Sequence, residues 1–475
     1  MNIFSQIMED GESVTGSEGT IRESDSEYSL HSPGERLPLH EAVFRNDIAG
    51  LAALLRDAKV QTSNTQIQVG CKDKHGNTAL HLAVMLGNSK CVQLLLSHGA
   101  PVKLKNKHGW SPLAEAISYG DRPTISSLLR RLKRQSKLEL ETRRPDMIKG
   151  LRDLGDFYLE IKWDFTSWVP LVSRILPSDI CRISKKGACV RLDTTLVDFN
   201  DMKWVRGDIA FIYNGDAGPD ADLAVLDNQA GVYQYVRKQE SELEFEDEVD
   251  LLMSSDIVAG QLSTKPISFS REKSGWIWKQ DKAAKLGNYM SDFYSVNGMV
   301  LESRKRREHL SAEDLQKNKA LLDSFSRGTP VDEETEECER RESLPPPQPS
   351  GISWREYIES TPGSLPALGR KHVTKSSKKA FKATIAMSED FPMKVDMLLA
   401  VLEVIAPQFK HFNKLKEFVT MRLPHGFPVQ VNIPVLPTVS AKVTFTDFAV
   451  REDLEDSLFV IPSHYTHDPT RFPDL

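Results

Sequence analysis

Cysteine is scarce in this sequence. The 475 residues include only five cysteines, an odd number, and no two of them follow a C-x-x-C spacing. This pattern predicts neither a disulfide framework nor a structural zinc site. A reducing compartment is therefore the simplest expectation for the chain. The five residues are Cys71, Cys91, Cys181, Cys189 and Cys338.

Long apolar runs are also lacking. The most apolar helix-like stretch, residues 395–406, contains Asp396 and Glu403 and ends at Pro407. A membrane-spanning helix needs about 20 apolar residues in a row. The first ten residues have neither the basic start nor the apolar centre of a secretory signal. Any contact with a membrane is therefore expected to be peripheral.

Neither an excess of positive charge nor a catalytic signature stands out. The 61 basic and 67 acidic side chains give a net charge of −6, which argues against nucleic acid as a partner. The patterns G-x-x-x-x-G-K, H-E-x-x-H and G-x-S-x-G do not occur. Asp208 and Asp216 flank a strand-like run and could form a carboxylate pair, but aspartates at strand ends more often form turns. We therefore predict no catalytic residue, no metal site and no cofactor.

An internal repeat is the strongest feature that the chain does have. The segment that starts at Asp73 recurs from Asn106, and Leu80 corresponds to Leu113, 33 residues later. A turn that leads into a T-P-L-H-x-A-like helix start with this period is typical of ankyrin repeats. Proteins of this kind usually bind other proteins and seldom catalyse reactions.

Each repeated position has a physical role. Gly76 stands where the tip of a hairpin needs a positive φ, Thr78 can cap the first helix, and Gly87 can close it. The second copy has Gly109, Ser111 and Gly120 at these places. A fainter copy starts at Pro38, with Asn46 in the glycine position, and about eight extra residues, 61–68, are expected to bulge from the junction that follows it.

Two histidines lie at the expected helix starts. His40 and His81 could suggest acid–base chemistry. The third copy has Ala114 at this position, which a catalytic pair would not explain. We therefore expect both imidazoles to hydrogen-bond neighbouring turns.

The fold class is predicted to be α+β, with an N-terminal ankyrin solenoid of about three repeats packed on a mixed α/β domain. A charged helix over 133–144 that ends at Pro145, together with the region from Trp163 to Trp168, is expected to cap the repeats. Strands are expected at 190–199, 208–213, 223–226, 232–236, 381–386, 427–433 and 441–448, and helices at 393–406 and 409–421. The expected parts are a disordered tail (1–36), the repeats (37–135), the first part of the second domain (136–326), a disordered Pro- and Glu-rich linker (327–351) and the second part of that domain (352–475).

Three charged segments allow alternatives. The acidic run 240–250 is expected to be a solvated loop, with a site for a basic partner as the alternative. The basic run from Arg304 to Arg307 is expected to lie on a charged helix face, with a nuclear or anionic-lipid signal as the alternative. Arg340 and Arg341 precede Ser343 in a pattern typical of basophilic kinase targets, so Ser343 is a candidate phosphorylation site.

Several longer stretches resemble a known family. They include D-F-Y-L-E-I-K-W-D-F at 156–165, V-L-E-S-R-K-R-R-E-H-L at 300–310 and the ending R-F-P-D-L at 471–475, with further segments at 167–179 and 191–199. Over residues 37–475 the chain resembles the ankyrin repeat domain-containing protein 13 family. The resemblance implies a G-protein-coupled-receptor chaperone domain after the repeats, peripheral attachment to the cytoplasmic face of the endoplasmic reticulum, and a role in receptor biogenesis and exit.

The expected partners are the cytoplasmic regions of nascent G-protein-coupled receptors. Other members of the family resemble endocytic adaptors with C-terminal ubiquitin-interacting helices, and the acidic residues 333–337 cannot form such a helix because prolines follow them. Ubiquitin is thus not expected as a partner, and a ubiquitin-independent trafficking adaptor is the alternative function. An enzyme is the third choice. The exposed hairpin tips are the expected binding surface, with these candidate residues: Lys74, His75, Asn77, Lys107, His108 and Trp110. Trp110 has the alternative of being a buried packing residue, since tryptophan is rarely left fully exposed.

Overall fold

The computed structural model describes most of the chain after residue 36. The described residues are 37–60, 69–167, 176–200, 203–236, 240–263, 267–275, 280–327, 340–361, 366–399, 423–436 and 439–472. The expected tail (1–36), the bulge at 61–68, Trp168, the acidic residues 333–337, the helix at 409–421 and the second half (400–406) of the helix at 393–406 lie outside them.

Three pairs of helices form the N-terminal part, as the 33-residue period predicts. They are α2 (Pro38–Phe44) with α3 (Ile48–Val60), α4 (Ala79–Met85) with α5 (Ser89–Ser97), and α6 (Pro112–Tyr119) with α7 (Arg122–Asp153). Thr78 and Ser111 cap α4 and α6 through their side chains. Asn46 has a φ of 53° and is the one non-glycine residue with positive φ in the part of the chain that the structure describes. The expectation for the fainter first repeat is therefore confirmed.

The two histidines act as structural groups, as expected. His40 Nε2 lies 3.0 Å from the carbonyl oxygen of Asn77, and His81 Nε2 lies 3.0 Å from that of Trp110. The other ring nitrogen of His81 accepts a hydrogen bond from the backbone N–H of Thr78. Each imidazole thus joins one repeat to the hairpin of the next.

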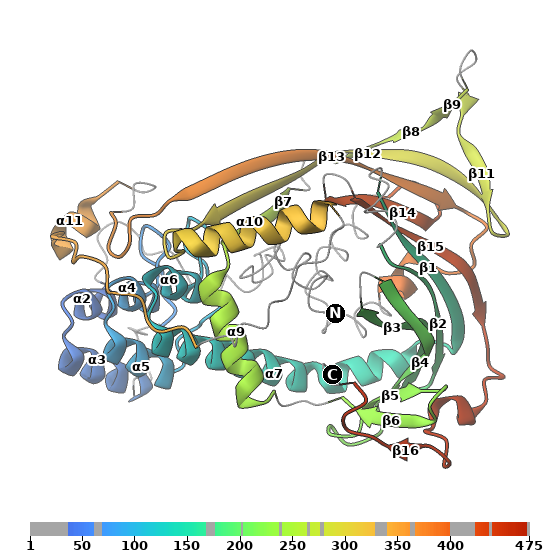
Figure 1. Ribbon diagram of the computed structural model, residues 1–475, viewed down its shortest axis with the longest axis horizontal. Helices are drawn as coiled ribbons and strands as arrows, with labels where there is room; N and C mark the ends of the chain where they lie inside the picture. Colours follow the sequence, from blue (N-terminus) through green and yellow to red (C-terminus); the bar gives the residue numbers. More distant parts are fainter. Residues whose placement is uncertain are drawn as a thin grey trace.

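Helix α7 continues far beyond the repeats. It has 32 residues and runs through Pro145, so the expected helix end at Pro145 is wrong and the expected boundary after residue 135 falls inside this helix. Residues 122–144 of the helix precede Pro145, so the backbone hydrogen bond that the proline removes lies in the later part of α7. Contacts with α9 and with the sheet also support the helix. Figure 1 shows α7 passing from the repeats to the far end of the molecule.

A large curved sheet forms the second part. Its path is β11-β12-β13-β14-β15-β1-β2-β3-β4-β5-β6-β16, and β7 and β8 also pair with β12. The ladders are antiparallel except for β16 with β6. The strands are β1 (Phe157–Ser167), β2 (Ser178–Lys186), β3 (Cys189–Asn200), β4 (Lys203–Asn214), β5 (Leu223–Asp227), β6 (Val232–Tyr235), β7 (Ile257–Ser263), β8 (Ser268–Arg271), β11 (Ala283–Leu286), β12 (Tyr289–Arg306), β13 (Thr374–Ser388), β14 (Phe427–Leu436), β15 (Val439–Val450) and β16 (Thr466–His467); β9 (Lys273–Ser274) pairs with β10 (Gln280–Asp281) in a separate hairpin.

All seven expected strands are present in this sheet, and β13 is much longer than expected. The expected cap is wrong, however, because Trp163 lies in β1 rather than against the repeats. Helix α9 (Glu242–Ser254) covers the last repeat instead, with Phe245, Val249 and Met253 buried in the same apolar core as α4 and α6. The repeats and the start of the second domain thus share one core.

The acidic run at 240–250 is a helix and not a solvated loop. It supplies most of α9, and its carboxylates pair with basic residues of α7: Arg122 with Glu246 and Asp250, Arg130 with Glu242, and Lys133 with Glu248. The basic partner of this run is therefore another helix of the same chain. A second core lies between the sheet and its covering segments, around Phe157, Phe391 and Phe448.

Candidate functional site: the hairpin edge of the repeats

The hairpin edge comprises the two described tips at 73–77 and 106–110, which share one geometry. Asp73 Oδ1 accepts hydrogen bonds from the backbone N–H groups of His75 and Asn77, at 2.8 and 2.9 Å. Asn106 Oδ1, 33 residues later, accepts from the N–H groups of His108 and Trp110, both at 3.0 Å. A side chain that accepts from the backbone two and four residues on fixes a tight turn. Asp73 and Asn106 are thus the residues that shape this edge.

The second tip docks on the first. The backbone N–H of Lys107 donates to the carbonyl oxygen of His75 at 3.0 Å. Asn106 Nδ2 also donates to Asn77 Oδ1 at 3.1 Å. These two bonds join the start of the second tip to the middle and end of the first, so they fix the spacing between the tips.

The predicted binding residues divide into two groups. Lys107 is exposed, and Lys74 and His108 are half-buried. His75, Asn77 and Trp110 are only 1 %, 0 % and 3 % exposed. The prediction that His75 and Asn77 are exposed is therefore wrong, and Trp110 is the buried packing residue that the sequence left as an alternative. A role of Lys74, Lys107 and His108 in partner binding stays a prediction.

A short helix from the distant part of the chain covers the first tip. Helix α11 (Trp354–Glu359) starts at a capping box made by Ser353 and Glu356. Its Tyr357 donates a hydrogen bond to Asp73 Oδ2 at 2.5 Å and accepts one from Asn77 Nδ2 at 2.9 Å. Burial, followed by the nearby Asp73 carboxylate, raises the pKa of the Tyr357 phenol well above its usual value. The phenol therefore stays protonated and able to donate.

Ring contacts also hold α11 against the repeats. The rings of Trp354 and Tyr357 lie 5.4 and 5.5 Å from the ring of Phe44 at the end of α2. His75 packs its ring 5.1 Å from that of Tyr357, and its Nε2 lies 3.0 Å from Ser360 Oγ. Figure 1 shows α11 beside α2 and α4, at the end of the repeats farthest from the curved sheet.

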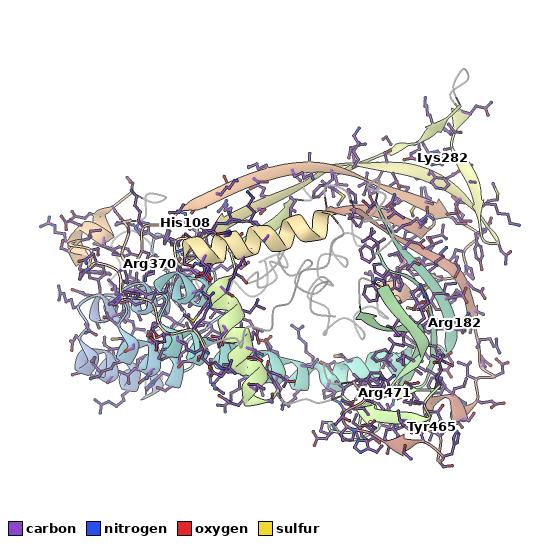
Figure 2. All side chains as sticks on the ribbon, in the orientation of Figure 1. His108, Arg182, Lys282, Arg370, Tyr465 and Arg471 are labelled. Carbon is purple, nitrogen blue, oxygen red and sulfur yellow. The ribbon has the colours of Figure 1, made fainter. Side chains whose placement is uncertain are left out.

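The end of β12 covers the second tip. Arg306 is fully buried; it donates to Glu115 Oε2 at 3.0 Å and to Glu308 Oε1 at 2.7 Å, and its guanidinium lies 5.0 Å from the centre of the Trp110 ring. Arg304 donates to the carbonyl oxygen of His108 at 3.0 Å. Figure 2 shows His108 on the side of the repeats that faces β13.

The basic run 304–307 is therefore not a helix face. It ends strand β12, and two of its members pair with Asp256: Lys305 at 3.4 Å and Arg307 at 2.6 Å. With Arg306 held by two glutamates, three of the four basic side chains pair with carboxylates of the same chain.

Electrostatics favour fixed protonation states at this interface. Burial opposes ionisation of Glu115, but Arg306 and then His372 outweigh it and lower the pKa of Glu115 to about 2. Burial lowers the pKa of His81 to about 4 and also lowers the pKa values of His75 and His108. At neutral pH the interface thus contains ionised carboxylates and arginine together with neutral imidazoles.

The candidate phosphorylation site lies on the repeats. Ser343 is exposed, and its Oγ accepts a hydrogen bond of 3.0 Å from the backbone N–H of Arg122. The N–H of Leu344 donates to the carbonyl oxygen of Gly120, and Arg340 and Arg341 pair with Asp250 and Asp314. The expectation that the linker 327–351 does not pack is therefore wrong for residues 340–344, because these ion pairs and a backbone bond hold them in place. Phosphorylation of Ser343 stays a prediction.

The other candidates have structural partners. Asp208 accepts from Asn228 Nδ2 at 2.8 Å, and Asp216 pairs with Arg152, so the two carboxylates serve separate turns. Within the described ranges no group of acidic, histidine or cysteine side chains could hold a metal ion. The helices that the structure describes include none long and apolar enough to cross a membrane.

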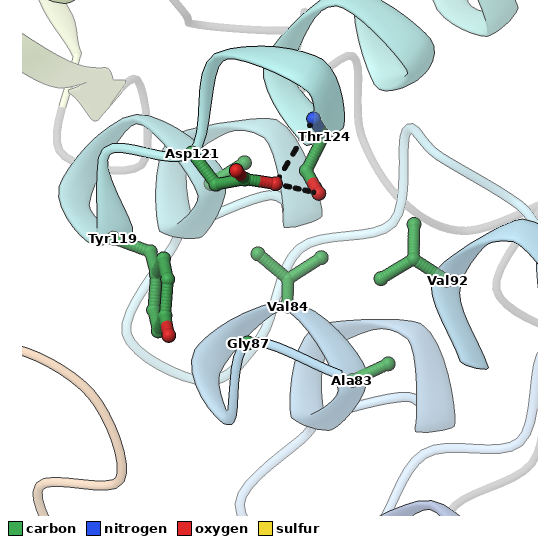
Figure 3. Close-up of a pocket in the computed structure, with 8 residues that line it drawn as sticks. Ala83, Val84, Gly87, Val92, Tyr119, Asp121 and Thr124 are labelled. Atoms are coloured by element: carbon green, nitrogen blue, oxygen red, sulfur yellow. Dashed lines mark hydrogen bonds between the residues drawn. The ribbon is translucent and has the colours of Figure 1, made fainter. Parts of the chain in front are cut away.

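Two cavities accompany these contacts. One of about 10 Å³ lies between α4 and α6, lined by Gly87, Tyr119 and Thr124 among others (Figure 3), and has room for about one water molecule. A second, of about 380 Å³, lies where α7 ends, beside Leu154, Met397 and Phe448. In the first, the Thr124 hydroxyl donates to Asp121, the residue that caps α7.

The sequence reasoning missed several residues of this edge. Asp73 and Asn106 could have been found, because turn-forming residues at a 33-residue spacing are a local signal. Tyr357, Arg306 and Glu115 could not, because Arg306 is 191 residues from Glu115 and Tyr357 is 284 residues from Asp73. No pattern within either segment indicates the other.

Stacked helix pairs with hydrogen-bonded tips define an ankyrin-repeat protein, a class whose repeats serve to bind other proteins. The model of ankyrin repeats, in three copies, matches residues 39–138, and the ANKRD13 C-terminal model matches residues 191–467, more than half of the chain. The chain belongs to the ankyrin repeat domain-containing protein 13 family.

Curated relatives agree with this assignment. Ankyrin repeat domain-containing protein 13C from Homo sapiens is 58% identical over 438 residues, which cover 92% of this chain and 79% of that protein. The protein of the same name from Danio rerio is 57% identical and covers 96% and 91%. Ankyrin repeat domain-containing protein 13B from Homo sapiens is 31% identical and covers 92% and 71%. Among solved structures, the human ASB11 ankyrin repeat domain is 29% identical over 20% of this chain and 40% of that chain, with a TM-score of 0.18.

Proposed function

We propose that the chain is a molecular chaperone and adaptor for G-protein-coupled receptors. It binds the cytoplasmic regions of nascent receptors at the cytoplasmic face of the endoplasmic reticulum and regulates their exit. Membership of the family supports the proposal, together with the protein-binding character of ankyrin repeats. The observation that carries it is the pair of lysines, Lys74 and Lys107, which project from equivalent tips of adjoining repeats.

The tips are suited to recognition rather than to chemistry. Lys74 and Lys107 stand on backbone that Asp73 and Asn106 fix, so their spacing does not depend on the partner. Ordered backbone under a charged side chain reduces the entropy that binding costs. Acidic groups on a receptor's cytoplasmic segment would complement these two cations.

Receptor capture tests the proposal. Replacing both Lys74 and Lys107 with alanine should reduce recovery of a newly synthesised receptor about tenfold, since each of the two cations contributes about 0.5–1 kcal/mol to such a contact. A matched variant, Lys137→Ala with Lys149→Ala, removes two exposed lysines from α7 and should recover receptor like the unmodified chain. Equal recovery by both variants would move the docking surface away from the tips.

Fractionation tests the place of action. We expect attachment to the endoplasmic reticulum through a protein contact, because the basic run at 304–307 already pairs within the chain. Alkaline carbonate should release the chain from these membranes, and moderate salt should release only part of it. A chain that sediments with endosomes and captures mature receptors would instead favour the ubiquitin-independent trafficking adaptor.

A further inference from the structure

Strand β13 has one unpaired edge over most of its length. Residues from Thr374 to Ala383 pair with β12 on one side, while β14 pairs on the other side only from Thr384 to Ser388. Beyond that point β14 continues against β15 alone, and Pro434 lies in this part of it. Proline has no N–H to donate, so β14 cannot extend the ladder along β13 there. About ten residues of β13 thus have no second strand partner among the described residues.

This edge is open to solvent on both faces of the strand. Every residue from Thr374 to Ala380 is exposed, whereas alternate residues of a covered strand would be buried. Figure 1 shows this part of β13 arching along the outside of the molecule between the repeats and the curved sheet.

The edge is strongly basic. No aspartate or glutamate occurs between Glu359 and Glu389, and four exposed lysines lie in the strand: Lys375, Lys378, Lys379 and Lys382. Lys378 pairs with Glu302 on β12 at 2.5 Å. On the neighbouring strand Lys305, which is opposite Lys375, is already paired with Asp256. The charge of the other lysines is therefore not balanced by the strand beside them.

The lysines project from both faces. Lys375 and Lys379 are on the face that continues into buried Ala383 and Ile385, and Lys378 and Lys382 are on the opposite face. A flat anionic surface could meet only one of these sets at a time. A strand added along the edge can place acidic side chains beside both, because its own side chains also alternate between the faces.

We propose that this edge binds an extended acidic segment of a partner protein by strand addition. The unpaired N–H and C=O groups of residues 374–383 supply the main-chain ladder, and the four lysines select a segment with acidic residues on both faces. Lysines on an edge also reject apolar strands and so prevent aggregation. The same four lysines that repel an apolar strand attract an acidic one, and this difference gives the edge its specificity.

A designed peptide tests the proposal directly. The probe is a fluorescein-labelled ten-residue peptide in which pairs of glutamates alternate with pairs of valines. We expect saturable binding by fluorescence anisotropy to the full chain. The same peptide with alternate amides N-methylated keeps its charge but loses the ladder donors on one edge, so it should bind at least tenfold more weakly. A peptide with lysines in place of the glutamates should not bind.

Matched protein variants test the role of the lysines. Changing Lys375, Lys378, Lys379 and Lys382 to glutamine should weaken binding of the acidic peptide at least tenfold. A control variant changes four exposed lysines outside β13 to glutamine and should stay within twofold of the unmodified chain. Its positions are Lys90, Lys137, Lys149 and Lys285.

Four results would overturn strand addition. Equal binding of the N-methylated peptide would make the contact purely electrostatic, and an equal loss in the control variant would make it non-specific. No binding of the acidic peptide at millimolar concentration would leave the lysines only the role of protecting the edge. Binding of phosphatidylserine vesicles that needs the four lysines, without binding of the peptide, would assign the edge to a lipid surface. None of these results depends on receptor capture at the hairpin tips.

Discussion

At the scale of single residues, the buried pair of Arg306 and Glu115 decides how the repeats meet the sheet. Their side chains are 0 % and 1 % exposed and lie 3.0 Å apart. Removing one member of such a pair leaves an uncompensated charge in a medium that solvates it poorly, which costs much more than the intact pair contributes. Glu308 depends on the same arginine.

The first prediction concerns this arginine. Arg306→Met should lower the free energy of unfolding by about 3–5 kcal/mol, because two buried carboxylates lose their partner. Lys305→Met, one residue earlier in the same strand, removes a pair that is 32 % and 12 % exposed and should cost less than about 1 kcal/mol. Urea unfolding followed by tryptophan fluorescence measures both. Equal costs would show that the burial of Arg306 has no energetic importance.

The second prediction concerns pH. Burial lowers the pKa values of His81 and His309 from 6.5 to about 4. Between pH 6.5 and 4 the unfolded chain binds more protons than the folded chain, so stability is complete above this window and falls as the pH falls through it. At pH 5 each histidine should cost about 2 kcal/mol relative to pH 7.5.

Thermal melting at the two pH values measures this effect. In His81→Gln the drop should be smaller by about 2 kcal/mol, since glutamine does not titrate. Below pH 4.5 the ionised Glu115, whose pKa is lowered to about 2, should add a further loss. A pH dependence that His81→Gln leaves unchanged would place the sensitive group elsewhere.

At the scale of elements, the glycines that end the short helices are set by backbone conformation and by the next repeat. Gly87 has a φ of 70°, and a Cβ added there would lie 2.1 Å from the hydroxyl oxygen of Tyr119 (Figure 3). Gly99 has a φ of 81° with no other atom within 4 Å of such a Cβ. A substitution at Gly99 therefore tests backbone strain alone, whereas one at Gly87 tests the same strain together with the contact to Tyr119.

The third prediction compares these glycines. Gly99→Val should destabilise the chain by about 1–2 kcal/mol, the cost of the left-handed conformation for a side chain with a Cβ. Gly87→Val should cost about 3 kcal/mol or more, because Tyr119 must also move. Denaturant midpoints compare the two, and an unchanged midpoint for Gly87→Val would contradict the assigned repeat register.

Sequence reasoning succeeded where the determinants are local. The positive φ at Asn46 and the cap at Thr78 follow from residues a few positions away, and the 33-residue period repeats them. It failed where a segment is defined by a distant partner. The acidic run at 240–250 forms a helix because α7 supplies arginines more than 100 residues earlier in the sequence. His75 is buried because the ring of Tyr357 packs against it.

The candidate site shows the same division. The positions of Lys74 and Lys107 on the hairpin tips could be predicted, since the tip is a property of one repeat. The covering of Asn77 by α11 and of Trp110 by β12 could not, because neither segment carries a repeat of its own. The unpaired edge of β13 was also not foreseeable, because its cause is the course of β14.

At the scale of the whole molecule, the repeats depend on residues outside them. Phe245, Val249 and Met253 of α9 lie in the same core as Leu82, and in addition Arg130 of α7 lies 3.9 Å from the centre of the Phe245 ring. Three repeats bury few apolar residues by themselves, and their end needs a covering element. Helix α9 fulfils that role here.

The fourth prediction tests this dependence. Phe245→Ala should lower the free energy of unfolding by about 3–5 kcal/mol and should reduce amide-exchange protection in α4 and α6 as well as in α9. Leu243→Ala, in the same helix but 65 % exposed, should change protection little. Loss of protection confined to α9 would mean that the repeats are stable without their cover.

Two long elements of different kinds act as struts between the repeats and the far part of the curved sheet: helix α7, and strand β12, which is itself a strand of that sheet. Helix α7 has 32 residues and β12 has 18, so they span about 48 and 59 Å at about 1.5 and 3.3 Å per residue. An extra residue in α7 would turn its far end by about 100°, and an extra residue in β12 would reverse which side chains face the core. Because both struts end on the same two bodies, a change of length in one would strain the other. The distance between the repeats and the far part of the sheet is thus fixed by both elements. Changing that distance requires whole helical turns in α7 together with an even number of residues in β12.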